Sequence, residues 1–199
     1  MSCYTTELAS GANVNQQEVS EVSTEQKWHV GGSLTDDLIA LFKEKAQKYG
    51  LDWKWLAALA YVESNWRTNV KNQYGYYGLF QFRQSTIDKG YSIYKPEDQT
   101  EIAAKNMSAA KNKANGYGMT NEDCYLYAGM SHNCGIGGAQ LLLGKASPKN
   151  VFQMVQVELT LPDSEFKYKF MSSSAKRKEI SEYPSKMKSA YVSICAKYT

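Results

Sequence analysis

The sequence predicts one mainly α-helical domain, and three observations lead to that prediction. Apolar residues recur at spacings of three and four in several segments. Helix-capping residues and glycines mark the ends of those segments, and no useful length of chain alternates apolar and polar residues as a half-buried strand does. The chain of 199 residues, 43% of them apolar, is long enough to bury a sizeable core, and it contains no internal repeat.

The first two helices are predicted by their caps. Residues 33–50 open with a capping box formed by Ser33 and Asp36, and they close on a glycine. Asp52 can then cap a second helix over residues 53–66. Apolar residues line one face of each segment, so both helices should pack on a core.

The rest of the chain continues the helical pattern. Residues 96–116 begin with a proline and two acidic residues and end on a glycine, which is typical of a helix. The tyrosine-rich loop before them, with Gly75 and Gly78, leaves room for a small β-hairpin. No pattern can be read over residues 162–174. Further helices are expected at residues 121–130, 135–144 and 147–161, and from Pro184 to the end of the chain.

The N-terminal residues 1–27 are polar and lack periodicity, so we interpret them as a flexible leader to a domain at residues 28–199. They show no signal-peptide pattern, so either the protein is made without one or the chain starts after its removal. Cys3 leaves open a trimmed lipoprotein. No stretch approaches the roughly 20 apolar residues that a transmembrane segment needs. Cys124 and Cys134 could form a disulfide or remain free thiols.

Charge and composition exclude several classes of function. The formal net charge of +3 comes without a dense stripe of lysines and arginines, which argues against nucleic acid as the main partner. The chain holds only His29 and His132 and no C-x-x-C spacing, so a structural zinc site is not expected. The 15 tyrosines and 4 tryptophans suit either a carbohydrate cleft or a protein core.

Glu63 departs from the helical pattern. In the second predicted helix the apolar stripe of Leu56, Leu59 and Ala60 continues to Glu63, so its carboxyl group points along the core face. A carboxyl group buried without a partner is costly to ionise, and an acid that keeps its proton near neutral pH is what general acid catalysis requires. The alternative is an exposed helix end, because most glutamates lie in solvent.

Short motifs around and after Glu63 follow one another in a definite order. A serine follows Glu63, and residues 78–81 read Gly-Leu-Phe-Gln, with Thr86 shortly after them. Residues 131–137 read Ser-His-Asn-Cys-Gly-Ile-Gly. Each of these motifs is weak when taken alone.

A fourth motif completes the pattern. Pro184 is followed seven residues later by Tyr-Val at 191–192. In this order the four motifs resemble the catalytic domain of soluble lytic transglycosylases, a goose-type-lysozyme-like family that cleaves peptidoglycan. The resemblance covers roughly residues 33–198 and implies a lysozyme-like multi-helix domain with a substrate cleft.

Four positions depart from the family pattern. Phe80 stands where the family usually has Met, and His132 stands where it has Tyr. Thr68 and Met187 replace a common proline and a common glutamate. His132 matters most, because a titratable ring takes the place of one that packs along the substrate cleft. An uncharged, packed histidine is the alternative.

The resemblance also implies a reaction that needs no metal and no organic cofactor. Glu63 would protonate the β-1,4 glycosidic oxygen between N-acetylmuramic acid and N-acetylglucosamine. As a base it would then take the proton of the muramic C6 hydroxyl, which closes a 1,6-anhydro ring. Most glycosidases use a second carboxylate, but none is evident at the matched positions. Asp88 and Asp98 lie outside the motifs.

The resemblance implies supporting roles for residues at the matched positions. Ser64 would orient the intermediate, Gln81 would bond the sugar and Asn133 would shape the site. His132 would line the cleft, and Gly78 would let the loop backbone approach the sugars. The serine could equally be a plain helix-surface residue, and the glycine a simple turn residue.

Tyr191 has two readings. It lies on the apolar face of the last predicted helix, so its ring belongs inside the protein. The resemblance adds that its hydroxyl should reach Glu63, position the acid and compensate its burial. A core tyrosine with a different partner is the alternative.

Two other functions remain open on the sequence. A goose-type lysozyme would use water as the acceptor and would need an acid such as Asp88 or Asp98 to activate it. A catalytically silent wall-binding component of a secretion, conjugation or phage machine would need no buried acid. Peptidoglycan as the partner places the protein in the cell envelope or periplasm, with a phage-associated enzyme as the alternative. We expect a monomer recruited by a larger assembly.

Overall fold

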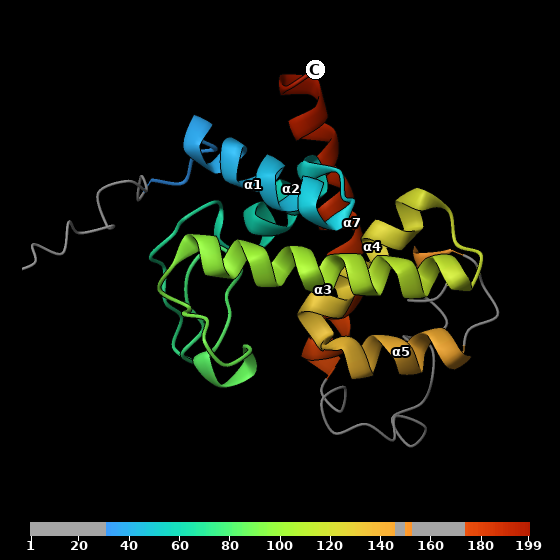
Figure 1. Ribbon diagram of the computed structural model, residues 1–199. Coiled ribbons are helices and arrows are strands. Elements are labelled where there is room, and N and C mark those ends of the chain that lie inside the picture. The colour runs from blue at the N-terminus through green and yellow to red at the C-terminus, as the bar shows by residue number, and fades with distance from the viewer. Residues whose placement is uncertain (1–30, 146–149, 153–173) are drawn as a thin grey trace, which may run out of the picture.

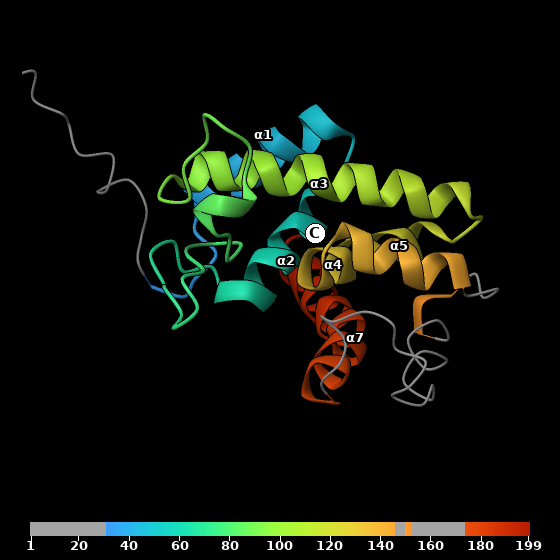
Figure 2. The same ribbon diagram turned by 90° about the horizontal axis from the view of Figure 1, so that it is seen from below.

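The computed structural model describes residues 31–145, 150–152 and 174–199. Within them the fold is helical, with no named strand, which confirms the predicted fold class. Seen from below, α2 and α4 lie between α3 and α7 (Figure 2), and α3 packs on α4 while α7 packs on both α2 and α4. The helices, drawn in Figure 1, are α1 (Asp36–Tyr49), α2 (Trp53–Ser64), α3 (Pro96–Gly116), α4 (Asn121–Cys134), α5 (Ile136–Lys145) and α7 (Ser174–Lys197), with a short 3-10 helix η2 (Gln84–Thr86).

The helix starts follow the predicted chemistry with one correction. The Thr35 side chain caps α1 by accepting from the Leu38 amide, so the capping box predicted at Ser33 is wrong by two residues. Asp52 caps α2 as expected and accepts from the Lys54 amide at 2.9 Å. Helix α3 has the predicted bounds. The N–H groups in the first turn of a helix have no partner within the helix, so the missing N–H of Pro96 costs nothing there. The acidic residues of the first turn are stabilised by the positive N-terminal end of the helix dipole.

Two predicted helix boundaries are wrong. Residues 131–134, predicted to link two short helices, complete the last turn of α4, and only Gly135 separates α4 from α5. Helix α7 begins at Ser174, ten residues before the predicted start at Pro184. The proline therefore lies inside a helix, where it removes one backbone hydrogen bond.

The loop between α2 and α3 contains less β-structure than expected. Only isolated bridges pair Tyr77 with Lys71 and with Phe82, so the predicted hairpin is reduced to two contacts. The loop nevertheless packs on the core, because Leu79 and Phe80 are fully buried.

The remaining predictions concern segments outside the described residues, the possible disulfide and membrane-spanning helices. The leader, all of the segment 162–174 except its last residue, and most of the predicted helix 147–161 lie outside them. Cys124 and Cys134 are free thiols, so the disulfide alternative is wrong. No helix in the described part of the chain is long and apolar enough to cross a membrane.

Candidate active site

Glu63 lies in the last turn of α2, beside the protein core. The helix ends immediately after it because Asn65 adopts a left-handed conformation, with φ of 55°, and its amide turns back to the Ala60 and Tyr61 carbonyls. The preceding members of the stripe are fully buried, and the Glu63 side chain is 15% exposed. The carboxyl group is therefore partly enclosed but still open on one side.

Tyr183 is the hydroxyl partner of Glu63. Its side chain comes from α7, is only 3% exposed and donates a hydrogen bond to Glu63 Oε1. Burial, and secondarily the neighbouring carboxylate, raise the pKa of Tyr183 well above its usual range. The phenol thus remains a hydrogen-bond donor, which fixes the orientation of the Glu63 carboxyl group.

The expectation that the Tyr191 hydroxyl reaches Glu63 is wrong. Tyr191 donates to Asp52 Oδ2 at 2.9 Å, at the opposite end of α2 from Glu63. Its ring stacks on Trp55 with centroids 3.9 Å apart. In this structure Tyr191 supports the N-terminus of α2 rather than the acid, which agrees with the core-tyrosine alternative.

A signal for Tyr183 was present in the sequence. Ile180, Tyr183, Met187 and Ile194 continue one buried stripe of α7 at helical spacings. Reading Pro184 as the start of the helix excluded Tyr183 from that stripe. The proline is one of the uncommon interior ones, and the rule that prolines begin helices misplaced the boundary.

His132 lies against both Glu63 and the loop. Its Nε2 is 2.8 Å from the Phe80 carbonyl oxygen and 4.0 Å from Glu63 Oε1. A carbonyl oxygen only accepts, so Nε2 carries a hydrogen in this arrangement. The ring also packs edge-on against Phe82, at 5.1 Å between centroids. His132 therefore packs between Glu63 and the loop.

Gln81 occupies a strained position in the same loop. Its φ of 48° lies in the left-handed region, which is uncommon for a residue other than glycine. Its side-chain Nε2 donates to the Gly78 and Val70 carbonyls, at 2.9 and 3.2 Å. These bonds hold the amide group in place and leave its Oε1 outside them.

Asn133 is held by the first turns of α7. Its Nδ2 donates to Glu179 Oε1 at 2.7 Å, and its Oδ1 accepts from Lys176 Nζ at 3.2 Å. Burial alone would raise the pKa of Glu179, but the hydrogen bonds from Asn133 and Lys176 outweigh it and lower that pKa. Glu179 was not predicted at the site from the sequence, because only the structure extends α7 back to it.

Gln81, His132 and Asn133 line a cleft of about 500 Å³ between the loop, α3, α4 and the start of α7. Glu63 does not line the cleft, but His132 does, and it lies beside Glu63. The lining mixes aromatic rings with amides and one cation, a composition suited to sugars. Its aromatic, amide, hydroxyl and charged members are Tyr76, Gln81, Phe82, Thr86, Asn106, Ser131, His132, Asn133 and Lys176.

Two predicted substrate contacts are not supported by the geometry. The Ser64 side chain is buried, and its hydroxyl lies within hydrogen-bonding distance of the Leu79 and Ala60 carbonyls, at 2.9 and 3.0 Å. Gly78 is also buried and packs against the Gln99 side chain, at a φ of 75°. Both residues fix the loop on α2 and α3, and neither lines the cleft.

The two suspected second acids lie elsewhere. Asp88 pairs with Lys105 at 2.6 Å on the surface, and Asp98 Oδ2 accepts from the Ser92 amide at 2.9 Å. Neither lines the cleft. Among the described residues, no group of three His, Cys, Asp or Glu side chains is placed to hold a metal ion.

Comparison with known proteins gives two matches. The sequence model of the transglycosylase SLT domain matches residues 40–149, which is just over half of the chain. The membrane-bound lytic murein transglycosylase F of Marinobacter nauticus is 45% identical over 49 residues. That stretch covers 25% of this chain and only 10% of the relative, so the similarity concerns a small part of the larger protein.

Proposed function

Because the chain belongs to the transglycosylase SLT domain family, we propose that it is a peptidoglycan lytic transglycosylase. The reaction is cleavage of the β-1,4 bond between N-acetylmuramic acid and N-acetylglucosamine, with formation of a 1,6-anhydro-muramic end. The observation that carries the proposal is the single partly buried Glu63, held by Tyr183 beside a cleft lined by no Asp or Glu.

The proposed reaction uses Glu63 twice. Protonated Glu63 gives its proton to the glycosidic oxygen while the bond from that oxygen to the muramic C1 breaks. The carbonyl oxygen of the muramic N-acetyl group attacks C1 and holds it as a cyclic intermediate. The Glu63 carboxylate then takes the proton of the C6 hydroxyl, whose oxygen bonds to C1 and releases the N-acetyl group. No water is consumed, and Glu63 ends protonated as it began.

The surrounding contacts suit these steps. Tyr183 donates to Oε1 of Glu63, so the other carboxyl oxygen is free to carry the transferred proton. His132 and Asn133 hold the cleft wall on the side of α4, and Gln81 presents its Oε1 as an acceptor for a sugar hydroxyl or amide. Lys176, which pairs with Glu179 at 3.0 Å, also lines the cleft, where its ammonium group suits the carboxylate of a muramic lactyl or peptide group.

The test is mass spectrometry of the soluble products released from purified peptidoglycan. Wild type should release fragments that end in anhydro-muramic acid, one water lighter than hydrolysis products. Glu63→Gln, which keeps the shape and removes the transferable proton, should release none. Reducing ends would instead identify a goose-type lysozyme and require a second acid.

A wall-binding component without activity is the remaining outcome. It would be supported if wild type and Glu63→Gln bound peptidoglycan equally and neither released product from several wall types. Under the proposed activity the protein works in the cell envelope or periplasm, where its substrate lies. The proposed enzyme acts as a monomer, recruited by an envelope-spanning or phage assembly.

A further inference from the structure

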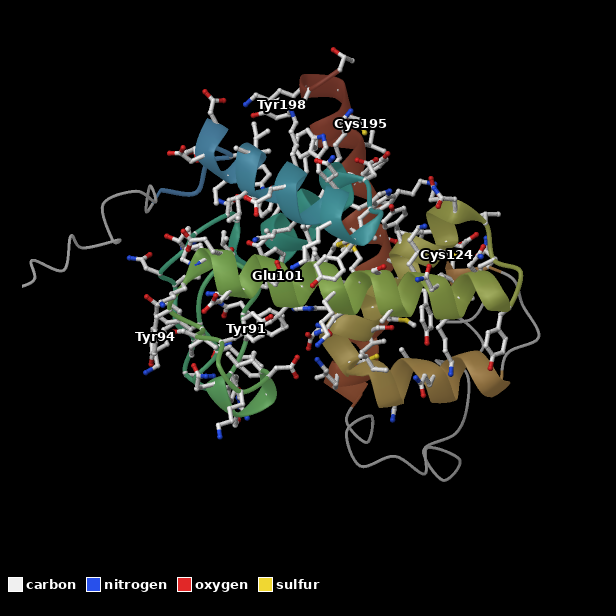
Figure 3. All side chains as sticks on the ribbon, in the orientation of Figure 1. Tyr91, Tyr94, Glu101, Cys124, Cys195 and Tyr198 are labelled. Atoms are coloured by element: carbon white, nitrogen blue, oxygen red, sulfur yellow. The ribbon has the colours of Figure 1, made fainter. Side chains whose placement is uncertain are left out.

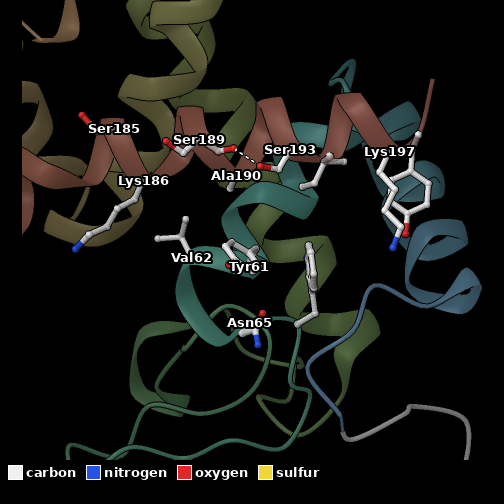
Figure 4. Close-up of a pocket in the computed structure, with 12 residues that line it drawn as sticks. Tyr61, Val62, Asn65, Ser185, Lys186, Ser189, Ala190, Ser193 and Lys197 are labelled. Atoms are coloured by element: carbon white, nitrogen blue, oxygen red, sulfur yellow. Dashed lines mark hydrogen bonds between the residues drawn. The ribbon is translucent and has the colours of Figure 1, made fainter.

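A second concave surface lies between the end of α2 and α7. This groove has a volume of about 740 Å³, and no residue lines both it and the cleft. Figure 4 shows Tyr61 and Val62 of α2, and Asn65 just after the helix, on the side of the groove opposite α7. Tyr61 is 43% exposed although its ring packs on Trp66 at 4.7 Å between centroids. A partly exposed aromatic pair in a hollow is typical of a binding surface.

The α7 side of the groove is polar and positively charged. Ser185, Ser189 and Ser193 follow one another at intervals of four, so they share one helix face. Lys186 and Lys197 also line the groove, and its lining includes no acidic residue. Lys186 additionally pairs with Glu182, at 3.2 Å, and Glu182 does not line the groove.

The chain enters the described structure at one end of this groove. Gly32 packs so closely against Asn65 that a Cβ atom there would overlap the Asn65 side chain. The Tyr198 hydroxyl donates to the Leu34 carbonyl at 3.4 Å. Asn65 and Tyr198 both line the groove, so Gly32 and Leu34, near the start of the described chain, lie at this end of it.

The N-terminal segment, residues 1–30, contains the acidic residues that are absent from the lining of the groove. Residues 1–30 contain four glutamates and one lysine, with Trp28 and Val30 at their end. Trp28 can lie up to about 14 Å from Gly32 when the chain is extended. Tyr61 is one helical turn, about 6 Å, from Asn65. A ring at position 28 can therefore reach the aromatic pair.

We propose that the N-terminal segment, residues 1–30, docks in the groove between α2 and α7. Trp28 packs against Tyr61, and the glutamates of the segment lie along the face that carries Lys186 and Lys197. The groove spans about 18 Å of α7, from residue 185 to residue 197, which about six extended residues cover. This inference is independent of the proposed activity.

The test is site-specific photocrosslinking in the full chain. A benzoylphenylalanine placed at Trp28 is irradiated, and the linked peptides are identified by mass spectrometry. The expected products join position 28 to residues 57–66 or 185–198 within one molecule. A mixture of normal and isotope-labelled protein distinguishes these from links between copies.

A new negative charge in the groove tests the electrostatic part of the proposal. Ser193→Glu should reduce the crosslinking yield several-fold at low salt, because the new carboxylate repels the segment. Val192→Glu is the matched control, since Val192 is 56% exposed on the same helix but does not line the groove. The proposal would be overturned by crosslinks to other residues, by crosslinks only between copies, or by the absence of crosslinks. Equal yields in the two charge variants would also overturn it.

Discussion

At the scale of single residues, two tyrosines of α7 have different partners and should have different effects. Tyr183→Phe removes the donor to Glu63 and should lower kcat on peptidoglycan about 10- to 100-fold, with a smaller change in KM, because the acid loses its orientation. Tyr191→Phe should leave kcat near wild type and lower the free energy of unfolding by about 1 kcal/mol, because it removes the bond to Asp52.

Turbidity loss of a peptidoglycan suspension gives the rates, and urea unfolding gives the stabilities of both variants. Equal loss of activity in the two variants, or loss only in Tyr191→Phe, would contradict the structural assignment. The comparison is informative because each change removes one hydroxyl from the same helix.

Gln99 shows how one buried side chain fixes the loop that carries Gln81. Gln99 is fully buried, its Oε1 accepts from the Phe80 amide at 3.1 Å, and its Nε2 donates to the Ile93 carbonyl. Gly78 packs directly against it. A buried backbone group that loses its partner costs about 1–3 kcal/mol.

Gln99→Met should therefore lower the free energy of unfolding by about 2–4 kcal/mol and reduce kcat, because the shape is kept while two backbone groups lose their partner. Gln140→Met, on the exposed face of α5, should change stability by less than about 0.5 kcal/mol. Urea unfolding and turnover are measured on both. A neutral Gln99→Met would show that the loop does not depend on these bonds.

At the scale of elements, one carboxylate joins α1 to α3. Glu101, labelled in Figure 3, lies on α3 and accepts from Lys48 and Tyr49 of α1, while Lys45 is 3.2 Å from its other oxygen. Burial alone would raise the pKa of Glu101, but the bonds from Lys48 and Tyr49 outweigh it and lower the pKa to about 2. The ionised form is therefore favoured by the folded state.

This shift predicts how stability depends on pH. The folded pKa, about 2, lies below the ordinary value of 4.5, so the contribution is complete above about pH 4.5 and is lost as pH falls towards 2. Glu101→Gln should lower the free energy of unfolding by about 1–3 kcal/mol at pH 6, with little difference from wild type near pH 2. Urea unfolding across this range measures it.

Glu122→Gln is the matched control. Glu122 pairs with Lys188 at 2.6 Å between α4 and α7, but both side chains are nearly half exposed. An exposed pair contributes about 0–1 kcal/mol and is screened by salt. A gap for Glu101→Gln that stayed constant from pH 6 to 2 would contradict the assigned shift.

At the scale of the whole molecule, local rules predicted helices and failed on contacts between them. The bounds of α3 and the Asp52 cap follow from residues that are adjacent in sequence. The apolar stripe likewise placed Glu63 beside the core. The partner of Glu63 is 120 residues away, and no local pattern distinguishes Tyr183 from Tyr191 once the start of α7 is misplaced.

The same limit explains the other corrections. Ser64 and Gly78 were expected at the substrate because they lie in matched motifs, but their neighbours are Leu79 and Gln99 in the folded chain. Spacing within a motif places a residue near a site, and it does not tell which neighbouring groups its side chain contacts. That depends on how separate elements pack.

The contact between α4 and α7 helps to position Tyr183 beside Glu63. A Cβ atom on Gly129 would lie 3.0–3.3 Å from three atoms of Met187, which is fully buried and one helical turn from Tyr183. Gly129→Val should therefore push α7 away, lower the free energy of unfolding by about 1–3 kcal/mol and reduce kcat by displacing Tyr183. Gly116→Val, which meets nothing within 4 Å, should leave kcat unchanged. If both variants lowered kcat equally, the loss would come from general destabilisation. A loss confined to Gly129→Val would show that the packing of α7 on α4 is required to hold Glu63 in position.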